Sequence, residues 1–233
     1  MCFCVLICVV AASAVRASFV VDPTVLTISA AAGEKTGSVT VKNTGNIPVA
    51  VELTVYERKL DLDGELDRTD LLPCKDFTVY PSEIILHPNR EFYVQLRYAG
   101  KEKIKEDRSY SLFSKEVLIP VEEEESDGVD IKLPTVMSYY TIINFETGKE
   151  GKLTYISSKA LKDDKIELIA ENRSGGRVVT RNLAIKTDTV IIKSFTGTKN
   201  SIMPGQKRRF TFKYVRPLTS REVKFIYDYN ESD

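Results

Sequence analysis

The chain has 233 residues, of which 42% are hydrophobic and 28% are charged, which is ordinary for a soluble globular protein of one large or two small domains. Lysine and arginine together number 33, as do aspartate and glutamate. Because the net charge is zero, the sequence predicts no overall attraction to nucleic acid or to an anionic membrane. One local basic cluster, Lys207–Arg209, is interpreted as a solvated hairpin.

Residues 1–17 differ in character from the rest of the chain. The apolar run MCFCVLICVVAASAV ends at Arg16, and it is shorter than the roughly 20 residues that a transmembrane helix needs. The pattern Val15-Arg16-Ala17 is typical of a signal-peptide cleavage site. We therefore expect residues 1–17 to be a cleaved secretory signal, so that an exported mature protein without a membrane span begins at Ser18.

The cysteines agree with export but exclude a disulfide scaffold. Cys2, Cys4 and Cys8 lie in the expected signal, which leaves Cys74 alone in the mature chain. A single cysteine has no internal disulfide partner. With His87 as the one histidine, the chain also lacks the soft ligands of a zinc site. We interpret Cys74 as a small, partly buried side chain.

The first half of the mature chain consists of short β-rich runs separated by turn signals, a spacing typical of an all-β sandwich. Pro23 in the first run removes a ladder hydrogen-bond donor, so it predicts an edge strand or a kink. Val51, Leu53 and Val55 alternate with polar residues and predict one buried strand face. The runs up to the acidic segment are 19–29, 38–46, 50–60, 77–98 and 110–120.

The second half of the chain also consists of short β-rich runs separated by turn signals. Its predicted strand regions are 165–179, 187–195, 201–215 and 221–229. The stretch 159–170 has a helix-like spacing, but its neighbours favour a strand. Residues Asn144–Glu150, NFETGKE, have the composition of a short linker. The predicted organisation is therefore two β-sandwiches, one over residues 18–144 and the other over residues 145–233.

No motif in the sequence indicates catalysis. There is no G-x-S-x-G nucleophile turn and no glycine-rich phosphate loop. Asp61, Asp63 and Asp67 offer oxygens for calcium, but an EF-hand loop needs glycine at its sixth position and Gly64 is fourth, which favours a hairpin turn. Short glycosylation patterns occur at 172–174 and 230–232. We expect a protein that is not an enzyme and that carries no metal or other cofactor.

Residues 120–133, PVEEEESDGVDIKL, combine a charge run with a strand pattern. The acidic segment 122–128 is too polar to pack and is predicted to be a solvated loop. After it, Val129, Ile131 and Leu133 alternate with charged residues and predict a strand with one apolar face. Two interpretations are open for these three residues: they pack in their own domain, or their face is offered to another protein.

Taken together, these segments resemble the PapD-like periplasmic pilus (fimbrial) chaperones. The resemblance covers nearly the whole mature chain and rests on a conjunction of segments rather than on one diagnostic motif. It implies two immunoglobulin-like β-sandwich domains. The segments that carry it are FVVDPTVLTI, SVTVKNTGN, the D-x-D-G hairpin, YPSEIILHPN, FYVQLRY and DRSYSLFSKEVLIP in the first domain, and ELIAENRSGGRVV and IMPGQKRRFTF in the second.

This resemblance implies a function for the alternating segment. In such chaperones the last strand of the first domain is lent to a pilus subunit, the client, whose own sandwich lacks one strand. Val129, Ile131 and Leu133 match the donor positions, and 122–128 matches the preceding loop. The implied partners are a pilus subunit and, in usher-dependent members, an outer-membrane usher. The alternative is a structural or adhesive PapD-like protein of the cell envelope that has no client.

The sequence also departs from the family. Usher-dependent members carry two cations in the cleft between the domains, where they hold the C-terminal carboxylate of the client. The corresponding positions here are Val25 and Ser138, and the family's Tyr-Arg-Pro step appears as Thr141-Ile142-Ile143. The sequence therefore does not predict carboxylate anchoring in the family's usual form.

Overall fold

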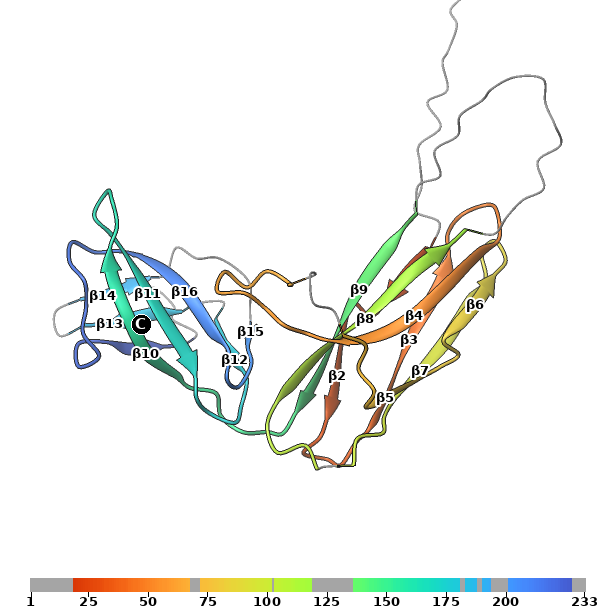
Figure 1. Cartoon of the computed structure of the whole chain (residues 1–233), viewed down its shortest axis with the longest axis horizontal. Helices are drawn as coiled ribbons and strands as arrows, with labels where there is room; N and C mark the ends of the chain where they lie inside the picture. The colour runs from red at the N-terminus through yellow and green to blue at the C-terminus, as the bar shows by residue number, and fades with distance from the viewer. Residues whose placement is uncertain are drawn as a thin grey trace, which may run out of the picture.

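A computed structural model shows a chain built of β-strands and turns (Figure 1). No helix occurs among the residues that it describes, and hence none that is long and apolar enough to cross a membrane. The described residues are 19–67, 72–101, 103–118, 136–180, 183–187, 190–193 and 201–227.

The first sandwich consists of two sheets with the strand orders β1-β3-β7-β5 and β2-β9-β8-β4-β6. All of its pairs are antiparallel except β2 with β9, which run parallel. Its strands are β1 (Phe19–Asp22), β2 (Val25–Ser29), β3 (Thr36–Asn43), β4 (Val49–Glu57), β5 (Phe77–Tyr80), β6 (Glu83–Leu86), β7 (Glu91–Tyr98), β8 (Arg108–Val117) and β9 (Ser138–Glu146).

Pro23 lies where the chain crosses from one sheet to the other. The strand before it, β1, is an edge of the first sheet, and the strand after it, β2, is an edge of the second. Since proline has no N–H to donate, it is tolerated at this break in the ladder. Both features expected at Pro23, the edge position and the break in the strand, are confirmed.

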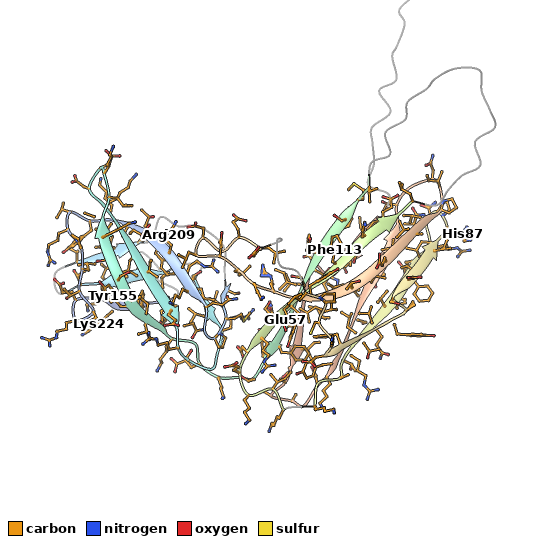
Figure 2. All side chains as sticks on the ribbon, in the orientation of Figure 1. Glu57, His87, Phe113, Tyr155, Arg209 and Lys224 are labelled. Atoms are coloured by element: carbon orange, nitrogen blue, oxygen red, sulfur yellow. The ribbon has the colours of Figure 1, made fainter. Side chains whose placement is uncertain are left out.

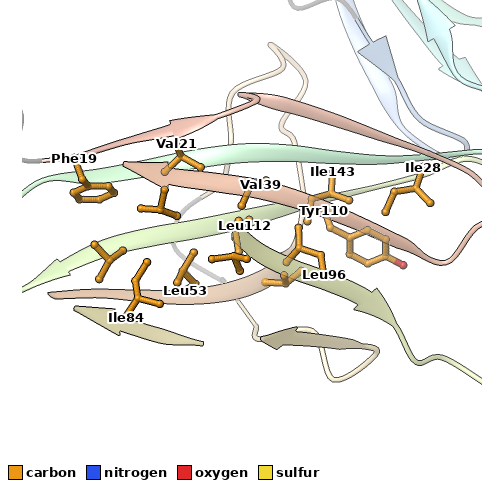
Figure 3. Close-up of a cluster of buried hydrophobic side chains, with 14 of the residues drawn as sticks. Phe19, Val21, Ile28, Val39, Leu53, Ile84, Leu96, Tyr110, Leu112 and Ile143 are labelled. Atoms are coloured by element: carbon orange, nitrogen blue, oxygen red, sulfur yellow. The ribbon is translucent and has the colours of Figure 1, made fainter. Parts of the chain in front are cut away.

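The core of this sandwich fills the space between the two sheets (Figure 3). The predicted face of β4 is buried, with Val51, Leu53 and Val55 between 1% and 3% exposed. Phe145 near the end of β9 is fully buried, and its ring lies 5.3 Å from that of Tyr98 and 5.8 Å from that of Phe77. Because β9 crosses this core, its position relative to the sheet is fixed by packing.

The second sandwich places the sheet β10-β11-β16 over the sheet β14-β13-β17 and the strand pair β12-β15. Its own core includes Ile166, Phe210 and Phe212, each at most 2% exposed. The prediction of two all-β sandwiches is confirmed. The strands are β10 (Leu153–Ala160), β11 (Lys165–Asn172), β12 (Val178–Val179), β13 (Ala184–Lys186), β14 (Ile191–Lys193), β15 (Ser201–Ile202), β16 (Lys207–Lys213) and β17 (Lys224–Ile226).

Strand lengths in the second sandwich differ from the predicted ones. The region 187–195 was expected to be one strand, but β14 covers three residues of it and Thr187 belongs to a turn, in which its N–H donates to the Val190 carbonyl at 2.8 Å. The stretch 159–170 is strand on both sides of a turn, as expected. Asp163 and Asp164 make that turn with φ values of 59° and 50°, the left-handed region that aspartate tolerates better than most residues.

Candidate functional site

The two sandwiches meet at one end and diverge from there (Figure 1). At the junction, Asp107 is 6% exposed and uses both carboxylate oxygens. Its Oδ1 accepts hydrogen bonds from the N–H and the hydroxyl of Thr147, each 2.7 Å long, and its Oδ2 accepts the N–H of Arg177 at 2.8 Å. The Asp107 N–H donates to the Gly175 carbonyl at 2.9 Å, and Arg177 also pairs with Glu146. These contacts join the two sandwiches at their base.

A hairpin, residues Leu60–Asp67, makes a second connection and is called the strap below. It follows β4 and is the orange segment that runs from there towards the second sandwich in Figure 1. Asp61 shapes its turn by accepting the N–H groups of Asp63 and Glu65 at 2.9 and 2.8 Å. The strap ends on β16, where the Arg209 N–H donates to the Leu62 carbonyl at 2.8 Å. The predicted hairpin turn is thus confirmed, and it bridges the sandwiches.

The basic cluster on β16 binds the strap. Arg209 forms ion pairs with Asp63 of the strap at 3.2 Å and with Glu167 of β11 at 3.1 Å. Arg208 is 4% exposed, and its guanidinium lies against Gly64. The expectation of a solvated hairpin at Lys207–Arg209 is therefore wrong for Arg208, which the strap covers, whereas the side chain of Arg209 pairs with the strap and stays 37% exposed. Figure 2 shows Arg209 on the second sandwich, on the side that faces the strap.

A cleft of about 670 Å³ lies between the strap, the first sandwich and the second. Its walls come from the outer face of the sheet β2-β9-β8-β4-β6, from the strap, and from β12 and β15 with their connections. Residues that line it include Arg58, Ser111 and Tyr140 of the first sandwich, Gly64 of the strap, and Arg177 and Gln206 of the second sandwich.

Aromatic side chains form a row across the cleft-facing sheet. Phe113 on β8 stacks on Tyr140 of β9 with a centroid distance of 4.8 Å, and it meets Tyr56 of β4 edge-on at 6.2 Å. Further along the same face, Val117 of β8 and Ile85 of β6 lie on either side of Ala50 and are 43% and 66% exposed. Glu52 and Lys115 lie opposite each other between these two apolar groups. Exposed apolar side chains gathered on one face are typical of an interaction surface.

Among the described residues, the first residues of β9 have a pairing strand on one side only, and this side is called the open edge below. Strand β2 pairs with β9 only from Ile142 onwards, so Ser138–Thr141 have β8 on one side and no described strand on the other. An edge of this kind presents backbone N–H and C=O groups that another strand can pair with. Val129, Ile131 and Leu133 precede this edge in the chain and lie outside the described residues, as does the loop 122–128.

This two-sandwich geometry occurs in solved structures of other proteins. No protein-family model and no curated protein sequence matches the chain. Among solved structures, a complex described as a chaperone-tip adhesin complex of CFA/I fimbriae biogenesis matches over 93% of this chain and 95% of that chain, with TM-score 0.56 and 13% identity. The E. coli chaperone DraB matches over 91% of both chains, with TM-score 0.52 and 16% identity.

A third match is the chaperone CsuC with the tip subunit CsuE from the archaic chaperone-usher pili of Acinetobacter baumannii, at TM-score 0.52 and 13% identity over 83% of this chain and 90% of that chain. The chain has the fold of a fimbrial chaperone. The likeness extends over both sandwiches, so the fold implied by the sequence resemblance is confirmed.

The structure also places the positions that depart from the family. Val25, on β2, lines the cleft and is 48% exposed, and Ser138 is exposed at the start of β9. Neither side chain carries charge, so the cleft lacks cations at both usual positions. Two arginines line the cleft elsewhere: Arg58, the residue after β4, and Arg177, which pairs with Glu146.

Other candidate positions have structural roles. Cys74 is half-buried and free, and burial raises the pKa of its thiol. Asn172, in a glycosylation pattern, is fully buried and donates its amide to the Gly176 and Ile202 carbonyls, each at 2.8 Å. No group of metal-binding side chains occurs in the part of the chain that the structure describes.

Sequence reasoning missed two residues of the site. Asp107 was noted only as part of the family-like segment that begins at Asp107-Arg108, although a buried aspartate before a strand is a common partner for backbone N–H groups. Nothing in the sequence marked Arg58 as a cleft residue, because a single arginine after a strand is usually solvated.

Proposed function

We propose that this protein is an exported chaperone that captures a pilus or fimbrial subunit lacking one strand and caps it by lending it the segment that leads into β9. The observation that carries the proposal is the open edge of β9 at Ser138–Thr141, which borders the cleft and directly follows the alternating residues Val129, Ile131 and Leu133. The fold likeness to fimbrial chaperones over both sandwiches supports it.

The physical logic is that of β-strand addition. A subunit without one strand exposes backbone hydrogen-bonding groups and an apolar groove, and it aggregates unless both are covered. A lent strand supplies the backbone ladder, and its alternate side chains fill the groove. Three aliphatic side chains, at roughly 1.5–3 kcal/mol each for full burial, contribute about 5–9 kcal/mol before ordering costs. The aromatic row beside the edge offers the client body a second apolar contact.

The cellular setting follows from the same proposal. Residues 1–17 direct export, and the mature protein acts in the periplasm, where it holds its client before assembly, with an outer-membrane usher as the receiving partner in an usher-dependent pathway. The role is binding rather than catalysis, with no cofactor. We take the mature chain as two folding units, predicted as residues 18–144 and 145–233. Because β9 runs to Glu146 and buries Phe145 in the first core, the expected linker 144–150 begins only after Glu146.

The test is a triple variant, Val129→Ser, Ile131→Ser and Leu133→Ser, co-expressed with the exported subunit encoded nearest to this protein. We expect client recovery to fall to background while the melting temperature of the purified protein stays unchanged, because donor residues contribute to the complex and not to the empty sandwich.

The matched control is Asp130→Ser with Lys132→Ser, which alters the opposite face of the same segment and should keep the client bound. Loss of cooperative melting in the triple variant would mean that the three residues pack in their own domain. Full client recovery by that variant would also refute strand donation.

A further inference from the structure

The two larger sheets of the second sandwich differ in the charge of their outer faces. In the sheet β10-β11-β16, Glu167 lies between cations and pairs with Lys159 at 3.2 Å and with Arg209 at 3.1 Å. The strands β13, β14 and β17 of the other sheet have the sequences AIK, IIK and KFI, each with one lysine and none with an acid. The second face therefore has positive charge that its own strands do not balance.

The register of β14-β13-β17 brings these lysines together. Lys186 of β13 lies directly opposite Lys224 of β17 on one side and opposite Ile191 of β14 on the other. Both lysines are exposed, and Ile191 is 45% exposed. Lys193 stands two residues from Ile191 on β14, on the same outward face, while the residues that alternate with them pack in the core. The result is a row of lysines beside an exposed isoleucine, called the lysine face below.

The fold itself gains nothing from this row. Like charges directly opposite each other in a sheet repel. In the described part of the chain, no acid forms an ion pair with Lys186 or Lys224. Asp188, in the turn between β13 and β14, lies outside the described residues. The repulsion between Lys186 and Lys224 is relieved when an anionic surface covers the face.

We infer that the lysine face docks on the surface of an anionic lipid bilayer, with Lys186, Lys193 and Lys224 at the headgroup phosphates and Ile191 at the edge of the acyl chains. Two features favour a bilayer over other anions. Val190, next to Ile191, is also 45% exposed, so the lysines flank adjacent apolar side chains, and a bilayer is the anionic surface with an apolar layer beneath its charges. Lysine also carries a compact charge on a long apolar stem, which suits such an interface.

Docking by this face leaves the client site accessible. None of the residues that line the cleft belongs to β13, β14 or β17. Figure 2 shows Lys224 at the end of the second sandwich that is turned away from the first, whereas Phe113 lies on the cleft-facing sheet of the first sandwich. Because the chain has no net charge, the lysine face rather than the whole molecule decides how it lies on the bilayer. The docked protein thus keeps its cleft and open edge free beside the membrane.

The test is co-sedimentation of the purified mature protein with vesicles. One set contains equal parts of phosphatidylglycerol and phosphatidylcholine, and the other contains phosphatidylcholine alone. We expect binding to the anionic vesicles that weakens as salt is added, and no binding to the neutral ones. Equal binding to both sets overturns the proposal. Binding to soluble polyglutamate as tight as that to the anionic vesicles also overturns it, because it assigns the face to an acidic protein partner.

A double variant, Lys186→Gln with Lys224→Gln, tests the residues. It should weaken binding to the anionic vesicles by about tenfold or more, since each lysine near such a surface strengthens binding about fivefold. Its melting temperature should stay the same or rise, because a like-charge pair is removed. Lys186→Arg with Lys224→Arg keeps both charges and should bind as the parent does.

The chain offers a matched control in Lys165→Gln with Lys213→Gln. These two exposed lysines also lie directly opposite each other, but on the sheet β10-β11-β16, so the control changes the net charge by the same amount. It should keep the parent's affinity for the anionic vesicles. Equal losses in the two glutamine variants would show that net charge rather than the lysine face decides binding, and would overturn the proposal.

This inference and the proposed function fail separately. If the triple serine variant keeps its client, strand donation is refuted, while the vesicle experiments still decide the lysine face. Conversely, a parent protein that captures its client but does not bind the anionic vesicles refutes membrane docking and leaves strand donation intact.

Discussion

The carboxylate of Asp107 accepts the backbone N–H of Arg177 across the domain junction, at 2.8 Å. Its other oxygen holds Thr147, in the segment between β9 and β10. One buried side chain therefore ties the start of β8, the connecting segment and the second sandwich together. Because the cleft opens from this junction, the geometry of the candidate site depends on it.

Asp107→Ala removes the acceptor of three hydrogen bonds and leaves the N–H groups of Thr147 and Arg177 without it. We expect a loss of about 2–4 kcal/mol in the free energy of unfolding, since bonds to a charged group contribute roughly 1.5–3 kcal/mol and the freed groups regain water in part. Urea unfolding measures the loss, and it should separate into two transitions as the sandwiches uncouple. Asp107→Asn, which keeps the shape and one acceptor, should lie between the variant and the parent.

Each sandwich uses a buried asparagine to close the turn after a strand. Asn43 donates to the Ile47 and Leu86 carbonyls at 2.8 and 2.9 Å, and Asn172 makes the equivalent bonds in the second sandwich. Both are fully buried. We expect Asn43→Asp or Asn172→Asp to lower the free energy of unfolding by about 2–4 kcal/mol, because two donors are lost and a charge is buried.

The measurement is urea unfolding of both single variants beside Asn89→Asp, in which an exposed turn asparagine is changed in the same way. A loss at Asn43 or Asn172 no larger than at Asn89 would show that these amides do not support the turns.

Much of the fold follows from local patterns. The alternation of Val51, Leu53 and Val55 predicts β4 because a strand with one buried face must repeat every two residues. Pro23 indicates a break because proline cannot donate to a ladder. Short strands such as β14 are less predictable. Two or three residues are too few to show an alternation of apolar and polar side chains, so tertiary packing decides whether they form a strand.

The cleft is harder to predict. Arg58 and Arg208 are far apart in the sequence, and what brings them together is the strap, whose docking on β16 depends on a backbone bond from Arg209 to Leu62 that no sequence pattern records. The donor residues Val129, Ile131 and Leu133 remain a prediction, because they lie outside the described residues.

Phe113 provides a test of the cleft-facing sheet as a client surface. Phe113→Ser should reduce recovery of the client several-fold while the purified protein keeps its cooperative melting, because the ring stands on the outer face rather than in the core. The control is Tyr93→Ser on β7, which removes a 67% exposed ring from the other sheet. Equal client recovery by the two variants would place the client elsewhere.

Tyr110 should make the first sandwich sensitive to alkali. It is 5% exposed in the aromatic cluster with Phe77 and Phe145, and burial raises its pKa to about 12, although its hydrogen bond with Arg108 acts in the opposite direction. The unfolded chain loses this proton near pH 10 and the folded one does so near pH 12. Stability from Tyr110 is therefore complete below pH 10 and declines as the pH rises towards 12.

Tyr110→Phe keeps the ring and removes this ionisation. The difference in unfolding free energy between parent and variant should therefore shrink as the pH rises from 10 to 12. Parallel urea curves at pH 8, 10 and 11.5 measure it. A constant difference across that range would show that Tyr110 ionises equally in both states.

Gly64 tests the strap most directly, because the chain provides a matched control in Gly33. Both glycines have a left-handed backbone, with φ values of 80° and 79°, so alanine at either position costs about 1–2 kcal/mol in backbone strain.

The two positions differ in the space around them. Gly33 has open space around it, whereas a Cβ on Gly64 would stand 1.8 Å from Nη1 of Arg208. Gly64→Ala must therefore also displace a buried guanidinium or lift the strap. We expect its unfolding free energy to fall by about 1 kcal/mol or more beyond that of Gly33→Ala. Equal losses in the two variants would show that the strap does not depend on its contact with Arg208.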